Sequence, residues 1–161
     1  MRSFHDGERS MLDRTLIGHC LTPHSVEVEK GRLRFFAKAT GQLDPVYLNE
    51  AAARQAGYRN IPAPPTFLFC LENDSPDPWE LQRLLGLDLG RLLHGEQSFV
   101  YHRIACAGDV LTFEPRLSDI YSRRDGALEF FVRETRVTDA MGEHIADLRC
   151  VGVQQHDGRP V

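Results

Sequence analysis

The sequence predicts an α+β protein, with helices in its first half and an antiparallel sheet in its second half. Residues 31–85 carry apolar side chains at helical spacing, interrupted by turns rich in proline and glycine. From Leu92 onward the apolar period changes to two, in four stretches that short turns connect. Long strands joined by short turns form an antiparallel meander. We therefore expect helices buried against this sheet.

The helical half begins with a short edge strand at residues 26–29, where valine alternates with glutamate. Residues 31–40 place apolar side chains on one face of a first helix. A second helix, 50–56, ends at Gly57, a typical C-cap residue. A third, 66–71, is almost wholly apolar (TFLFCL), which is typical of a helix buried by a sheet.

The turn cluster at residues 72–78 (ENDSPDP) ends this apolar helix, and a further helical turn follows at 79–85. In the third strand, Leu128, Phe130 and Val132 are predicted to face inward. The predicted strands lie at 99–102, 110–121, 128–132 and 145–153, with turns at 123–126 and 139–142.

The segment between the first and third helices holds polar side chains on a restrained backbone. Asp44 precedes Pro45, and Asn49 is placed to cap the second helix. Residues 62–65 (PAPP) then force an extended approach, so that the third helix begins near Thr66. A helix entered in this way directs free N–H groups toward the preceding segment, which makes this region a candidate site.

Two blocks of sequence carry a family resemblance. The first contains ATG-x-x-D-P, A-x-x-A-G and IPAPPTF, and the second contains LHGEQ, FVYHR and AGD. This order resembles the MaoC-like dehydratases, in particular the type I fatty-acid-synthase-like dehydratase N-terminal domains. The resemblance implies a hot-dog fold, in which a sheet wraps a long central helix. It also implies acyl thioester substrates, carried by coenzyme A or acyl carrier protein, with reversible addition of water across a 2,3 double bond.

The sequence departs from this family where the chemistry takes place. Active members resemble S/T-G-D-x-N-P-x-H in the segment called the overhang, where Asp and His activate water. A glycine N–H at the start of the central helix holds the thioester carbonyl. The changed positions are Gln42 for Asp, Asp44 for Asn, Tyr47 for His and Pro65 near the glycine.

These changes remove the required chemical groups. A glutamine amide cannot act as a general base, and a tyrosine with a pKa near 10 is a poor one. Proline has no N–H, and loss of one oxyanion donor typically costs ~10²–10³ in rate. We therefore expect the chain to be unable to catalyse the family reaction alone.

The candidate catalytic residues are Asp44, Tyr47 and His94. The candidate substrate-binding residues are Thr66, Phe67, Gly95, Glu96 and Gln97. Strand alternation predicts that His94 and Glu96 share a face while Gln97 points the other way. Because both blocks carry the family resemblance, we expect them to meet in one crevice near Thr66 in the folded dimer. Each polar candidate also has a purely structural interpretation. Asp44 can organise a turn, which is the interpretation that we favour for it. Tyr47 can bury its ring, and His94 can be a core histidine.

The net charge of −4 and the scattered arginines argue against a nucleic-acid partner. Neither a secretory signal nor an apolar run of ~18 residues is present, which predicts a cytoplasmic protein without a membrane span. The four cysteines lack ligand or disulfide spacing, so we expect buried thiols and neither metal nor cofactor. We expect one hot-dog domain over residues 1–161, with a core at about 10–155 and a frayed tail at 156–161.

Three functions remain open from the sequence. The first is a hydratase or dehydratase subunit whose partner supplies the Asp/His pair. The second is a non-catalytic acyl-binding subunit. The third is a homodimeric thioester hydrolase with a divergent site. The first two imply a dimer with a second hot-dog subunit.

Overall fold

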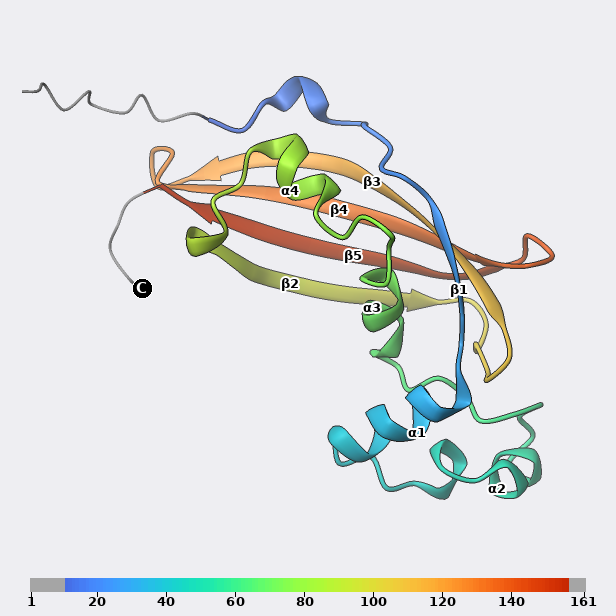
Figure 1. Ribbon diagram of the computed structural model, residues 1–161. Coiled ribbons are helices and arrows are strands. Elements are labelled where there is room, and N and C mark those ends of the chain that lie inside the picture. Colours follow the sequence, from blue (N-terminus) through green and yellow to red (C-terminus); the bar gives the residue numbers. More distant parts are fainter. Residues whose placement is uncertain (1–10, 157–161) are drawn as a thin grey trace, which may run out of the picture.

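The computed structural model describes residues 11–156, in which a five-stranded antiparallel sheet carries helices on one face (Figure 1). The spatial order is β1-β3-β4-β5-β2, so β1 and β2 are the two edge strands. The predicted meander is therefore correct for β3 to β5, while β2 returns to pair with β5. The strands are β1 (His24–Glu27), β2 (Leu92–Tyr101), β3 (Val110–Arg123), β4 (Leu128–Asp139) and β5 (His144–Gln155).

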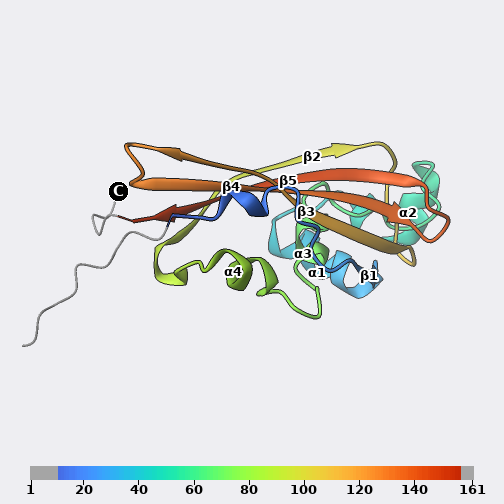
Figure 2. The same ribbon diagram turned by 90° about the horizontal axis from the view of Figure 1, so that it is seen from above.

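The helices come from the first half of the chain, as predicted. They are α1 (Lys30–Ala39), α2 (Glu50–Gln55), α3 (Phe67–Glu72) and α4 (Glu80–Leu85), with 3₁₀ turns η1 (Arg14–Leu16), η2 (Pro45–Tyr47) and η3 (Leu89–Arg91). Figure 2 shows α3 and α4 on the same side of the sheet. The central helix α3 is only six residues long, shorter than the resemblance implies. Pro76 and Pro78 lie in the turn that follows, and proline cannot continue a helix.

The core has two parts on the helical face. Phe67, Leu68 and Leu71 of α3 are buried against the apolar side chains of β3, β4 and β5. Leu81 and Leu85 of α4 pack in a second cluster that includes Phe131. The apolar pattern of both helices therefore faces the sheet.

The inward face predicted for the third strand is wrong. Phe131 packs with the α4 cluster and Thr135 reaches α3, whereas Phe130 stacks on Tyr121 with ring centroids 4.8 Å apart. Val132 is also buried, although it points to the face of the sheet opposite to Phe131 and Thr135. Because both faces of β4 carry apolar residues at this end, alternation alone could not identify the helical face.

The end of the chain also differs from expectation. His156, predicted to belong to a frayed tail, lies with Nε2 2.7 Å from the Glu129 carboxylate, and its N–H donates to Ala127. Residues 157–161 lie outside the described part. The four cysteines are free thiols, but Cys20 is exposed rather than buried. Among residues 11–156, no helix is long and apolar enough to span a membrane.

Candidate functional site

The overhang between α1 and α2 is held by its own polar side chains. The Asp44 carboxylate accepts the Val46 N–H at 3.0 Å and caps η2. The Gln42 amide oxygen accepts the Asp44 N–H at 3.1 Å, and Asn49 caps α2. The turn-forming role that the sequence predicts for Asp44 is therefore confirmed.

Tyr47 is half-buried on the overhang. Its pKa is raised from the ordinary value, first by desolvation and then by the neighbouring Tyr58 and Asp44. The phenol is therefore protonated at neutral pH. In this state it can donate a hydrogen bond but cannot act as a general base.

The start of α3 is joined to the far end of β2. The Tyr101 hydroxyl donates to the Pro65 carbonyl, and burial raises the Tyr101 pKa to about 12. Thr66 is exposed at this position, whereas Phe67 is buried and packs edge-on against Phe36 at 5.2 Å. Of the two predicted binding residues here, only Thr66 presents a surface that a ligand can reach.

A β-bulge at Gly95 changes the geometry of the LHGEQ block. His94 lies opposite Gly152, and Glu96 lies opposite the very next residue, Val151. Since consecutive residues of a strand point to opposite faces, the predicted sharing of one face by His94 and Glu96 is wrong. Glu96 instead pairs with Arg149 at 3.0 Å.

The bulge requires glycine. A Cβ atom at Gly95 would lie 3.0 Å from Val153 Cγ2 and 3.2 Å from the Val151 carbonyl oxygen. Beyond the bulge, Gln97 lies opposite Cys150, so it shares the helical face with His94. His94 and Gln97 are thus the pair that this block presents to α3.

His94 lines a pocket of about 260 Å³ between α3, α4 and the sheet. Its ring meets Phe69 of α3 edge-on at 5.4 Å. The walls are mainly apolar, with polar groups from a few side chains, as is typical of small-molecule sites. The other lining residues are Asn73, Leu81, Gln82, Leu92, Leu93, Phe131, Arg133, Cys150 and Gly152.

Gln97 has an unusual environment. Both polar atoms of its amide are buried, and neither has a hydrogen-bond partner among the described residues. A buried amide without partners is costly, so this position calls for a physical explanation. The sequence named Gln97 as a candidate but gave no sign of this burial.

A buried ion pair beneath α3 was missed by the sequence analysis. Glu72, with a side chain only 2% exposed, accepts from Arg133 Nη2 at 2.7 Å and from the Thr135 hydroxyl. Arg133 also lines the pocket. Glu72 begins a stretch of turn residues (ENDSPDP), and such a stretch is typical of solvent-exposed side chains.

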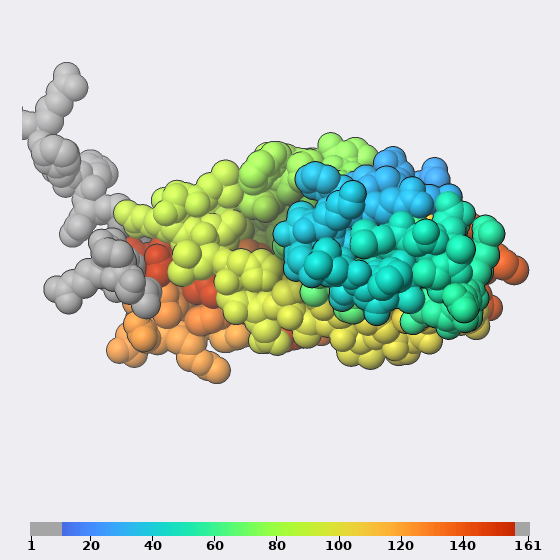
Figure 3. All heavy atoms as spheres, turned by 90° about the horizontal axis from the view of Figure 1, so that it is seen from below, coloured from blue at the N-terminus to red at the C-terminus, as the bar shows by residue number. Residues whose placement is uncertain are grey.

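The two predicted halves of the site do not meet within one chain. The pocket of His94 contains neither Asp44 nor Tyr47, and η2 packs against α1 and α2. Figure 3 shows the overhang at one end of the molecule and the residues that begin β2 toward the other. The convergence near Thr66 was predicted for the dimer, so it stays a prediction that this single chain does not test.

Comparisons with known proteins agree with the fold. The family model for the FAS1-like dehydratase domain region matches residues 15–148. A UPF0336 protein of Streptomyces avermitilis is 36% identical over 135 residues, which cover 83% of this chain and 89% of that protein.

Solved structures give the same result. The C-terminally truncated HadBC (3R-hydroxyacyl-ACP dehydratase) complex of Mycobacterium tuberculosis matches with a TM-score of 0.73 and 25% identity, over 86% of this chain and 96% of that one. A MaoC-like dehydratase matches with a TM-score of 0.77 and 24% identity, over 87% of this chain and 42% of that one. The chain therefore has the hot-dog fold of the MaoC-like dehydratases and belongs to the FAS1-like dehydratase family.

Proposed function

We propose that the chain is one subunit of a dimeric hydratase or dehydratase that acts on enoyl or 3-hydroxyacyl thioesters, and that its partner supplies the Asp/His pair. The observation that carries this proposal is the chemistry of the overhang. Gln42 and Asp44 hold the turn through hydrogen bonds to backbone N–H groups, and Tyr47 is a protonated phenol. The Gln42 amide and the Tyr47 phenol cannot act as general bases, and the Asp44 carboxylate is engaged as the cap of η2.

The binding half of a site is nevertheless present. The pocket beneath α3 has apolar walls for an acyl chain, and the His94 imidazole opens onto it. The buried amide of Gln97 lacks partners among the described residues, which fits a contact completed by a thioester or by a second subunit. The match to the HadBC (3R-hydroxyacyl-ACP dehydratase) complex supports a role as one subunit of a complex.

We expect the isolated chain to hydrate crotonyl-CoA at no more than a trace rate, because Gln42 and Tyr47 stand where active members carry Asp and His. The loss of enoyl thioester absorbance is followed with excess protein, and then after addition of a hot-dog subunit that carries an intact G-D-x-N-P-x-H motif. Turnover at or above ~1 s⁻¹ by the chain alone would contradict the need for a partner.

We also expect the chain to form dimers through β2. This strand pairs only with β5, which leaves its other edge free among the described elements. An exposed edge with exposed apolar residues, here Leu93 and Val100, favours pairing with a second hot-dog subunit. Light scattering is expected to give about twice the 18.3 kDa chain mass, and a stable monomer at micromolar concentration would argue against this interface.

A non-catalytic acyl-binding subunit is the second candidate, favoured by the pocket itself. Activity of the reconstituted complex separates the two functions. If the complex turns over but substitutions at His94 leave its rate unchanged, this chain serves for binding only.

A further inference from the structure

Three side chains that can bind metal lie together at the end of the sheet, outside the pocket beneath α3. His102 follows the end of β2, while His144 and Asp147 lie at the start of β5. The Nε2 atoms of His102 and His144 lie 2.8 and 2.9 Å from the two different carboxylate oxygens of Asp147. The three ligand atoms all lie within 4.8 Å of one another.

The backbone fixes this arrangement. The His102 N–H donates to the Ile145 carbonyl at 2.9 Å, which ties the turn after β2 to β5. In the ladder Asp147 lies opposite Val100, two residues before His102. The two imidazole rings consequently lie with centroids 4.1 Å apart. Each side chain is therefore held on a paired segment rather than on a loose loop.

We propose that His102, His144 and Asp147 form a binding site for a divalent transition-metal ion of the zinc type. Two imidazole nitrogens and one carboxylate oxygen are ligands that Zn²⁺ accepts, whereas Mg²⁺ and Ca²⁺ favour oxygen alone. Zinc bonds of ~2.0–2.1 Å in a tetrahedron place ligand atoms about 3.3 Å apart. To admit the ion, the N···O contacts of 2.8 and 2.9 Å would open by about 0.5 Å, and any wider separation among the ligand atoms, which all lie within 4.8 Å of one another, would close toward 3.3 Å.

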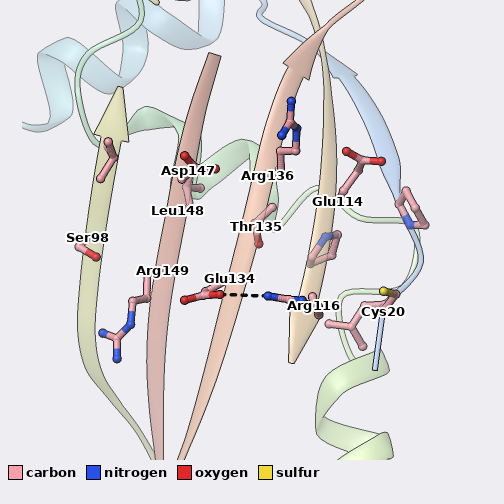
Figure 4. Close-up of a pocket in the computed structure, with 14 residues that line it drawn as sticks. Cys20, Ser98, Glu114, Arg116, Glu134, Thr135, Arg136, Asp147, Leu148 and Arg149 are labelled. Atoms are coloured by element: carbon pink, nitrogen blue, oxygen red, sulfur yellow. Dashed lines mark hydrogen bonds and ion pairs between the residues drawn. The ribbon is translucent and has the colours of Figure 1, made fainter. Parts of the chain in front are cut away.

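The exposure of the cluster agrees with this assignment. The side chains of His102, His144 and Asp147 are 42%, 29% and 48% exposed. Figure 4 shows Asp147 on the face of the sheet away from the helices. An ion can reach this site from solvent and retain an open coordination position.

The expectation of no metal is based on the absence of histidine and cysteine at ligand spacing in the sequence. Here 45 residues separate His102 from Asp147, and only the pairing of β2 with β5 brings them together. The site uses no residue of the pocket beneath α3, so its test does not depend on the proposed thioester chemistry.

The test is calorimetric titration of the untagged, metal-free full chain with zinc chloride. We expect one ion per chain, and we expect His144→Ala and Asp147→Asn each to weaken binding at least tenfold. His19→Ala is the matched control, because it removes an exposed histidine elsewhere and should leave binding unchanged. If His144→Ala does not fold by circular dichroism, His102→Asn replaces it.

Cobalt(II) as a spectroscopic probe identifies the ligands. Binding through His102, His144 and Asp147 gives no thiolate-to-cobalt charge-transfer band. Absence of stoichiometric zinc binding by the folded wild-type chain would overturn the proposal. Zinc binding that persists in the histidine variants would also overturn it. The same holds for binding that is lost in Cys20→Ser, since the exposed Cys20 is the competing ligand.

Discussion

Replacing Glu72 with alanine is expected to lower the free energy of unfolding by about 3–5 kcal/mol, because it leaves a buried charge without its partner. The Glu72 side chain is 2% exposed and that of Arg133 is 16% exposed. The Nε atom of Arg133 already lacks a partner among the described residues, so loss of the carboxylate would leave the guanidinium poorly satisfied. Urea denaturation followed by circular dichroism measures this change.

Two further variants test the cause. The double variant Glu72→Leu with Arg133→Met removes both charges, and it should be more stable than Glu72→Ala because no charge remains buried alone. Glu134→Ala is the control, since Glu134 and Arg116 form a 3.5 Å pair whose side chains are about half exposed. Such surface pairs contribute at most ~1 kcal/mol. If Glu72→Ala lowers the free energy of unfolding by no more than Glu134→Ala does, the buried ion pair does not stabilise the fold as we infer.

Replacing His94 with alanine is expected to abolish the activity of the reconstituted complex while leaving its melting temperature nearly unchanged. The side chain is exposed at the mouth of the pocket, and its ring meets Phe69 edge-on at 5.4 Å. Removal of an exposed ring costs little stability, whereas loss of the imidazole removes the titratable side chain that we place at the site. Turnover of crotonyl-CoA and thermal unfolding are measured on the same preparations.

His94→Phe separates the two properties of the ring, because phenylalanine keeps the aromatic contact but cannot transfer a proton. We expect this variant to be as inactive as His94→Ala. If His94→Ala instead lowers stability by a few kcal/mol and spares turnover, His94 is a structural histidine. Activity retained by His94→Phe would show that the imidazole nitrogens are not needed.

Local signals in the sequence determined much of the fold. Asp44 and Asn49 are caps whose hydrogen bonds reach only two or three residues along the chain, so their roles follow from position. Proline acts in the same local way before α3. The apolar pattern of α1 identified its buried face, because helical periodicity needs no knowledge of the partner surface. For α3, the almost wholly apolar sequence predicted burial but no particular face.

The long-range arrangement of the candidate site was decided only by the tertiary structure. Tight contacts with Val151 and Val153 of another strand favour glycine at the Gly95 bulge. The bulge places Gln97 rather than Glu96 on the same face as His94. Glu72 becomes buried because Arg133 and Thr135, 61 and 63 residues away, supply its partners. The sequence by itself therefore determined most of the elements, the caps and the presence of Gln42 and Tyr47 on the overhang. Strand register and packing decided which polar groups meet, since these contacts form between residues whose separation in sequence carries no local signal.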